Sequence, residues 1–307
     1  MSSTTPGTAP ASQDAPTVSG DAGAHRLAVL GAGTMGTGIA TLAVGHGVPV
    51  VLVDVDAETV RHAETKVRHQ SRMAQLMGSL PTDREPGELT TATAVDAVKE
   101  ATVVVEAVTE TNEAKAAALG GASAAVAPGT VLVTNTSGLP LSELAAHVAR
   151  PAELLGTHFM NPPYLIRTVE VVRGDQTGQA AMDTLRGFLD VLERQHVVVR
   201  DSPGFVTSRL LHPMINTAAR IVESGTATAA DVDTLMRGCL GHPTGPLRTG
   251  DMIGLDNLVD SLWALHARTG DDACRPCDLL QEMVRDGKHG RKSGRGFYDY
   301  AETETLA

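Results

Sequence analysis

The chain has 307 residues, of which 42% are hydrophobic, 20% charged and 3% aromatic, and its formal net charge is −11. That length favours two domains over a single core, and the composition is typical of a globular protein. The negative charge argues against nucleic acid as the main partner, because phosphate binding needs clustered Lys and Arg side chains.

Residues 1–24 are rich in Ser, Thr, Pro, Ala and Gly, and they have neither a basic start nor an apolar centre. They predict a disordered tail rather than a signal peptide. No apolar run reaches the length of a membrane span, so we expect no membrane contact. Three cysteines do not suggest a disulfide framework, which favours a cytoplasmic protein. We interpret the C-x-x-C of Cys274 and Cys277 as two thiols at a helix start, and we expect no metal site.

From residue 25 to residue 200, strands and helices alternate. Strands are predicted at 27–30, 48–54, 102–108, 130–138, 154–160, 168–173 and 196–200, and helices after the turn at 31–36, from 57 to 77, after 111 and at 178–194. The alternation predicts an α/β fold with a Rossmann-type, doubly wound parallel sheet. After Arg200 the periodicity is helical, with no convincing strand. We therefore expect an all-α C-terminal domain over residues 201–307, following a dinucleotide-binding domain over residues 25–200.

The stretch "GAGTMG" predicts where a dinucleotide binds. Gly31, Gly33 and Gly36 form a G-x-G-x-x-G pattern, with Thr34 and Met35 between the last two glycines. The pattern follows a strand and opens a helix, which is the context that the dinucleotide fingerprint requires. Gly31 permits the tight turn, Gly33 lets the backbone approach the pyrophosphate, and Gly36 lets helix and strand pack. The helix N-terminus would then support the phosphate charge.

Asp54, at the end of the second strand, favours NAD over NADP, because its carboxylate accepts ribose hydroxyls and repels a 2′-phosphate. Asp56 is the alternative acid, and FAD is the alternative cofactor. Further polar residues stand at strand ends or helix starts that face the same crevice. Each alone is more often a helix cap than a ligand, but together they are site candidates: Glu110, Lys115, Asn135 and Ser137.

A histidine and a glutamate stand out in "GTHFMNPPYLIRTVEVV", residues 156–172. His158 ends one predicted strand and Glu170 lies inside the next, past a Pro-Pro corner. Neither suits a hydrophobic core unless the two satisfy each other. A neutral imidazole can take the proton of an alcohol, and a carboxylate can orient that imidazole and stabilise its cation. We interpret them as the proton-transfer pair of an alcohol dehydrogenation.

The sequence resembles the L-3-hydroxyacyl-CoA dehydrogenases, including the bacterial 3-hydroxybutyryl-CoA dehydrogenases. The resemblance covers residues from about 26 to 300 and rests on "GAGTMGTGIA", "VVEAVTE", "NTSGLPLSEL", "GTHFMNPPYLIRTVEVV", "DSPGFVTSRLL", "HPTGPLRTGDMIGLDN" and "GRKSGRGFYDY". It implies that His158 and Glu170 are the catalytic pair and that Ser137 holds the reacting oxygen. It also implies a homodimer formed through the C-terminal domain, and NAD contacts at Glu110, Lys115, Asn161 and Lys292.

Two departures from the family pattern concern the substrate. Ser208 stands where the family has an asparagine that helps hold the substrate, and the shorter serine leaves room for an extra polar group. Relatives have a lysine-rich stretch facing the coenzyme A nucleotide, whereas the matching stretch of this chain reads "RHQSRMAQLMG", with Arg68 and Arg72 but no lysine run. Both departures suggest a carrier other than free coenzyme A. The stretches "HFMNPPYLI" and "GFVTSRLLHPM" are similar to a polyketide-pathway branch of the family that acts on a group held on an acyl carrier protein, and this resemblance implies such a carrier. A glyceryl group, used in hydroxymalonyl-type extender units, is the acyl group that this branch of the family would imply.

Two alternatives use the same fold. One is a dehydrogenase of a free small hydroxy acid, of the carnitine or gulonate type. The other is a non-catalytic NAD-binding protein, against which an intact pair of His158 and Glu170 argues.

Overall fold

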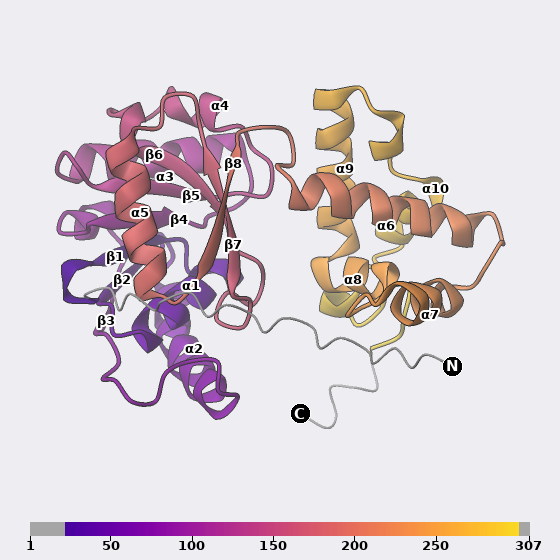
Figure 1. Ribbon diagram of the computed structural model, residues 1–307, viewed down its shortest axis with the longest axis horizontal. Coiled ribbons are helices and arrows are strands. Elements are labelled where there is room, and N and C mark those ends of the chain that lie inside the picture. The colour runs from indigo at the N-terminus through magenta and orange to yellow at the C-terminus, as the bar shows by residue number, and fades with distance from the viewer. Residues whose placement is uncertain (1–21, 301–307) are drawn as a thin grey trace, which may run out of the picture.

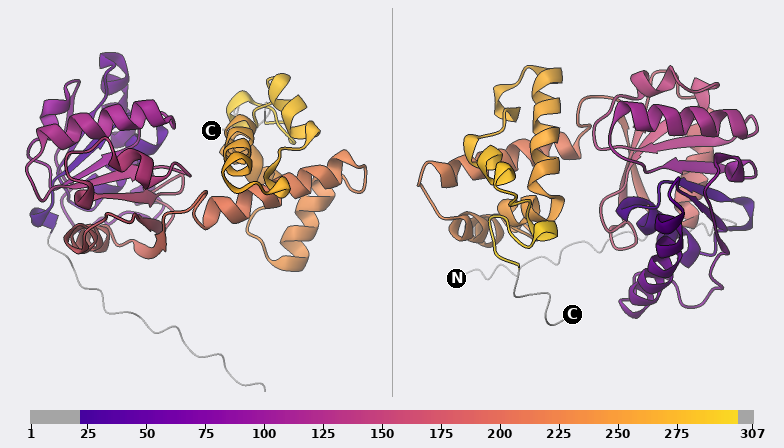
Figure 2. Two further views of the ribbon diagram at one scale, coloured as in Figure 1. Left: turned by 90° about the horizontal axis from the view of Figure 1, so that it is seen from above. Right: turned by 180° about the vertical axis from the view of Figure 1, so that it is seen from behind.

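The structure is a computed structural model that describes residues 22–300. Residues 1–21 of the predicted tail lie outside the described residues, and Ala22–Ala24 form a 3-10 turn (η1). An α/β part and a helical part lie side by side (Figure 1). The chain passes from the first to the second along the start of α6 (Figure 2).

The sheet of the α/β part has eight strands in the order β3-β2-β1-β4-β5-β6-β7-β8. The strands are β1 (Leu27–Leu30), β2 (Val50–Val53), β3 (Leu89–Ala92), β4 (Val103–Glu106), β5 (Val131–Asn135), β6 (Leu154–His158), β7 (Thr168–Arg173) and β8 (Gln195–Arg200). In this order, all the strands from β3 through β2, β1, β4 and β5 to β6 run parallel to one another. β7 runs antiparallel to β6 and pairs in parallel with β8. The predicted Rossmann-type fold is confirmed, with its last two strands reversed.

Helices cover both faces of this sheet. They are α1 (Thr34–Gly45), α2 (Ala57–Leu76), α3 (Asn112–Ala125), α4 (Leu141–Ala145) and α5 (Gln179–Val191), with 3-10 turns η2 (Val95–Val98) and η3 (Pro151–Glu153). In β1, Leu27 and Val29 pack in a core with α1, α2 and α5, whereas Ala28 and Leu30 pack on the other side with α3 and α4. Side chains that alternate across a strand thus build two cores, which is why these strands are apolar throughout.

β3 is an edge strand that the sequence analysis did not predict. Its sequence, "LTTA", is short and half polar, and it is only partly buried. An edge strand has one free side and needs no continuous apolar run, so it gives a weak signal in the sequence.

The helical part consists of α6 (Thr207–Glu223), α7 (Ala229–Leu240), α8 (Pro246–Ile253), α9 (Leu255–Thr269) and α10 (Asp278–Arg285), with η4 (Asp272–Cys274) and η5 (Arg291–Ser293). These helices share one apolar core. Cys277 is the N-cap residue of α10, as expected for a thiol at a helix start, whereas Cys274 is the last residue of η4 and does not begin a helix. None of the helices within residues 22–300 is long and apolar enough to cross a membrane.

A buried aspartate fastens the last described segment to this core. Asp251 is 1% exposed and accepts the backbone N–H groups of Phe297 and Tyr298, each at 3.0 Å. The hydroxyl of Tyr300 donates to the same carboxylate. The "GRGFYDY" segment is therefore docked on the helical part, and it is not a solvated loop.

Candidate active site

The three glycines of the turn between β1 and α1 differ in how closely other atoms approach them. Gly31 has φ +96°, and a Cβ there would lie 2.6 Å from the carbonyl oxygen of Ala107. A Cβ on Gly36 would collide with the carbonyl oxygen of Gly31, whereas one on Gly33 would meet nothing within 4 Å. Two of the glycines are thus required by the fold itself, and Gly33 leaves space beside the backbone.

That open position is also the start of α1. Gly33 is the N-cap residue, and no side chain caps the helix there. The first N–H groups of a helix have no partner within it, and with the helix dipole they form a site for an anion. Thr34 and Met35 follow directly in the first turn, where the sequence analysis placed the pyrophosphate.

The two candidate acids after β2 have different roles. Asp54 accepts the N–H of Ala32 at 2.8 Å, which ties its half-buried carboxylate to the glycine turn. Asp56 caps α2, because it accepts the N–H groups of Glu58 and Thr59 and the Thr59 hydroxyl. Hydrogen bonds from Thr59 lower the pKa of Asp56. The Asp56 carboxylate is thus used to cap α2, and Asp54 is the acid that lies beside the glycine turn.

A buried charge network lies where β4 and β5 end. Lys115 and Glu106 are both fully buried, and the Lys115 Nζ lies 2.8 Å from Glu106 Oε1. The same ammonium lies 3.1 Å from Glu110 Oε2 and donates to the backbone carbonyl of Asn135 at 3.1 Å. Thr134 and the N–H of Val108 donate to Glu106 as well. Lys115 therefore holds the ends of β4 and β5 together, and because its side chain is fully buried it cannot contact a cofactor directly in this conformation.

Glu110 and Ser137 belong to the exposed side of the same network. Glu110 Oε1 accepts the backbone N–H of Ser137 at 2.8 Å and its hydroxyl at 3.2 Å, and also the hydroxyl of Thr136. Burial would raise the pKa of Glu110, but the charge of Lys115 and these hydrogen bonds lower it. Asn135 is buried, and its side-chain oxygen accepts the N–H of Phe159 at 3.1 Å, which fixes the chain just after His158.

His158 and Glu170 meet as the sequence predicts. They face each other across the antiparallel β6–β7 pair, and His158 Nδ1 lies 3.1 Å from Glu170 Oε2. Both side chains are largely buried, with exposures of 13% and 6%. Burial would raise the pKa of Glu170, but hydrogen bonds from His158, Thr207 and the Val206 N–H lower it. The carboxylate therefore stays ionised and accepting next to the imidazole.

The pair lies at the same edge of the sheet as the glycine turn. Leu30, the last residue of β1, is in register with Glu106, which pairs with Thr134, which in turn pairs with Gly156. His158 is two positions beyond Gly156 in β6. The carboxyl ends of β1, β4, β5 and β6 thus bring the glycine turn, the Lys115 network and the histidine to one edge, where open α/β sheets bind their ligands.

Other predicted residues are not joined to this cluster. Asn161 is exposed in the turn after β6, and Ser208 is 2% exposed within the first turn of α6. Lys292 lies in the helical part, where its Nζ is 2.6 Å from Asp256 Oδ2.

Three further residues of the site region were not predicted from the sequence: Glu106, Thr207 and His212. Glu106 is hidden in the apolar run "VVVE", and Thr207 resembles an ordinary helix-start residue. His212 lies in α6 one turn after Ser208, is 6% exposed, and its Nδ1 is 2.7 Å from the Ser261 hydroxyl.

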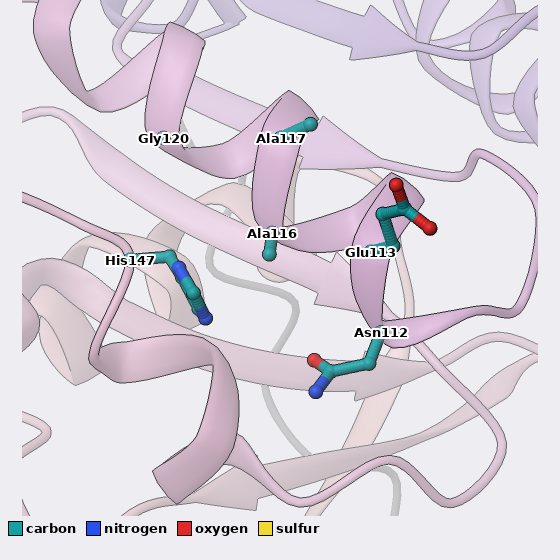
Figure 3. Close-up of a pocket in the computed structure, with 6 residues that line it drawn as sticks. All are labelled: Asn112, Glu113, Ala116, Ala117, Gly120 and His147. Atoms are coloured by element: carbon teal, nitrogen blue, oxygen red, sulfur yellow. The ribbon is translucent and has the colours of Figure 1, made fainter.

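A surface depression lies away from these residues. It is lined by α3 and by His147, as Figure 3 shows, and its lining residues are Asn112, Glu113, Ala116, Ala117, Gly120 and His147. None of them is a predicted site residue.

Two family models match the chain. "3-hydroxyacyl-CoA dehydrogenase, NAD binding domain" matches residues 26–202, and "3-hydroxyacyl-CoA dehydrogenase, C-terminal domain" matches residues 204–300. The probable 3-hydroxybutyryl-CoA dehydrogenase of Bacillus subtilis is 36% identical over 280 residues, which are 90% of this chain and 98% of that protein. The 3-hydroxybutyryl-CoA dehydrogenase of Bradyrhizobium diazoefficiens is 34% identical over 279 residues, 90% of this chain and 95% of that one.

Solved structures agree with these matches. FadB2 of M. tuberculosis superposes with a TM-score of 0.86 at 36% identity, covering 90% of this chain and 99% of that one. The (S)-3-hydroxybutyryl-CoA dehydrogenase PaaH1 of Ralstonia eutropha superposes with a TM-score of 0.82 at 33% identity, with the same coverage.

Proposed function

Because the chain belongs to the 3-hydroxyacyl-CoA dehydrogenase family, we propose that it oxidises a 3-hydroxyacyl thioester to the 3-oxoacyl thioester with NAD. The observation that carries this proposal is the contact of 3.1 Å between His158 Nδ1 and Glu170 Oε2 at the edge of the sheet that holds the glycine turn. That geometry supplies an oriented base where a hydroxyl group must lose its proton.

The hydrogen bonds around His158 indicate which nitrogen acts. Nδ1 faces two oxygens, of Glu170 and Thr207, so it carries the proton in the neutral ring and Nε2 keeps the lone pair. Nε2 takes the proton of the substrate hydroxyl, and the ionised Glu170 stabilises the imidazolium that forms. In the reverse direction the same imidazolium returns the proton to the oxygen of the 3-oxo group.

The residues of the crevice fit NAD, which when bound supplies the acceptor of the hydride. The open space at Gly33 and the uncapped N-terminus of α1 would hold the pyrophosphate. Asp54 would accept the hydroxyls of the adenine ribose, and Glu110 would face the nicotinamide half. Lys115 would act through Glu110 because it is buried.

Ser137 and Ser208 are the proposed substrate contacts. The Ser137 hydroxyl is half-exposed and donates to Glu110 at 3.2 Å, and from there it can turn to the reacting oxygen. Ser208 and His212 lie one turn apart on α6 and both are buried, and we propose that they supply polar groups to the acyl side of the crevice. This polarity favours an acyl group that bears a further hydroxyl, such as glyceryl.

An acyl carrier protein as the thioester carrier is the finer form of this proposal. The helix α2 exposes basic side chains on a chain of net charge −11, and a carrier protein is acidic. One of them, Arg68, is paired with Glu64 at 2.8 Å. The exposed basic residues of α2 are Arg61, Lys66, Arg68 and Arg72.

We also propose a homodimer formed through the helical part. That part exposes large apolar side chains, which an interface would cover. They are Leu210, Leu235, Leu240, Met252 and Trp263. Analytical ultracentrifugation tests this, with a single species of twice the chain mass expected and a monomer at micromolar concentration contradicting it.

Formation of NADH tests the activity. The panel comprises (S)-3-hydroxybutyryl-CoA, glyceryl-loaded acyl carrier protein, free 3-hydroxybutyrate, carnitine and gulonate, with the His158→Gln variant as the control. We expect NADH from a thioester and none from the free acids. Turnover of a free acid alone would identify the small hydroxy acid dehydrogenase, and NAD binding without any turnover would identify the non-catalytic protein.

A further inference from the structure

Thr207 touches both members of the catalytic pair. Its hydroxyl oxygen lies 2.7 Å from Glu170 Oε2 and 3.0 Å from His158 Nδ1. We propose that Thr207 is a positioning residue that holds His158 in the tautomer and orientation required of the base. The inference rests on the proposed function, to which it adds a third side chain contributed by α6.

The proton of the hydroxyl has one destination. An ionised carboxylate only accepts, so the Thr207 O–H donates to Glu170. The lone pairs of Thr207 Oγ1 then face Nδ1 of His158, which can only donate to them. The Nδ1–H lies between two acceptors, and a flipped tautomer would set its lone pair against both oxygens. Thr207 thereby keeps the Nε2 lone pair turned to the substrate side.

Glu170 in turn caps the helix that carries Thr207. Its Oε1 accepts the N–H of Val206 at 2.8 Å and that of Thr207 at 3.4 Å. The N-cap residue of α6 is Val206, which has no side-chain acceptor of its own. A carboxylate at a helix N-terminus is stabilised by the free N–H groups and by the helix dipole. The catalytic carboxylate is therefore also the missing cap of the first helix of the helical part.

The chain before α6 is shaped for this contact. Gly204 and Phe205 both have positive φ angles, of +69° and +51°, so the backbone turns sharply just before the helix. Phe205 is 2% exposed, packs against Leu141 and Val172, and lies edge-on to the His158 ring with centroids 6.2 Å apart. A non-glycine residue at positive φ costs energy that surrounding packing must offset. This turn directs the start of α6 toward Glu170. The position of the helical part therefore affects the position of His158, the proposed base, through Glu170 and Thr207.

Two substitutions separate the hydroxyl from the methyl group of Thr207. Thr207→Val removes the hydroxyl at nearly constant volume, and Thr207→Ser keeps it. Thr217→Val is the matched control, because Thr217 lies on the same helix and donates only to the Pro213 carbonyl. The measurements are kcat, the KM values for NAD and thioester, and the pH profile of kcat/KM.

We expect Thr207→Val to lower kcat by about 10-fold, as for loss of a hydrogen bond to a charged group, with both KM values within about 2-fold. The acid limb of the profile should move to lower pH, because the oxygen that faces the imidazolium is gone. Thr207→Ser should keep wild-type kcat and profile, and so should Thr217→Val. A wild-type kcat and acid limb in Thr207→Val would overturn the proposal, and so would equal losses in Thr207→Val and Thr207→Ser.

A second measurement needs no turnover and covers the case in which Thr207→Val does not fold. In ¹⁵N-labelled protein without substrate, we expect His158 as the single Nδ1–H tautomer, with a slowly exchanging proton, in wild type and Thr207→Ser. We expect faster exchange in folded Thr207→Val. The opposite tautomer in Thr207→Ser or wild type would overturn the inference. An inactive wild type with the expected tautomer would contradict the proposed function and leave the inference about Thr207 standing.

Discussion

Removing the buried cation of the Lys115 network should destabilise the fold strongly. Lys115→Met leaves the fully buried Glu106 carboxylate without the ammonium that lies 2.8 Å away. At that separation the attraction is about 6 kcal/mol for an effective dielectric constant of about 20, and desolvation of both groups offsets part of it. Since the loss of one partner strands the other, we expect the free energy of unfolding to fall by about 3–5 kcal/mol.

Urea unfolding followed by circular dichroism measures this change at pH 7. The double variant Lys115→Met/Glu106→Gln is the control, because it removes the stranded charge together with its partner. Burial already raises the pKa of Glu106, with Lys115, Thr134 and Val108 opposing the rise. We expect the double variant to be less destabilised than the sum of the single variants. A single variant within about 1 kcal/mol of wild type, or strict additivity, would refute the reasoning.

Two further predictions concern the glycine turn and α6. Gly33→Val should leave the unfolding midpoint nearly unchanged and weaken NAD binding by at least about 10-fold in a fluorescence titration, because its side chain would enter open space and occupy the phosphate position. Gly36→Ala should lower stability itself, because its Cβ meets the Gly31 carbonyl; the reverse ranking of the two variants would be inconsistent with the turn. Burial lowers the pKa of His212 to about 4, so the unfolded chain gains a proton here from pH 6.5 downwards while the folded chain does not. The contribution of neutral His212 to the free energy of unfolding is present above pH 6.5, and up to about 3 kcal/mol of it is lost as the pH falls to 4. In urea unfolding, His212→Gln should flatten the dependence of the free energy of unfolding on pH in this range. An unchanged dependence would exclude His212 as its source.

The fold could be predicted from the sequence where burial leaves a periodic signal. The strands of the parallel sheet are apolar on both faces, and Gly31 and Gly36 mark the two positions of the turn that tolerate no side chain. The reversal of β7 could not be predicted in this way, because a strand that runs up and one that runs down have the same apolar pattern. It depends on the corner after His158, and it brings Glu170 into register with the histidine.

The candidate site was predictable as far as residue type and strand position allow. The sequence brings His158 and Glu170 together because they flank one turn, a local relation. Lys115 was expected at the cofactor, but its burial depends on contacts of its helix, α3, with Glu106 and Asn135, which end the strands β4 and β5. Thr207 was missed for the same reason. Its role comes from a contact between the first helix of one part and a strand of the other.

The central claim is that His158 is the base, and single-turnover hydride transfer in His158→Gln tests it most directly. NAD affinity is measured on the same samples, and Glu170→Gln serves as the companion variant. We expect the transfer rate of His158→Gln to fall by about 10²–10⁴-fold while the Kd for NAD stays within about 2-fold of wild type. A fall of less than about 10-fold, or a parallel loss of NAD binding, would contradict the assignment.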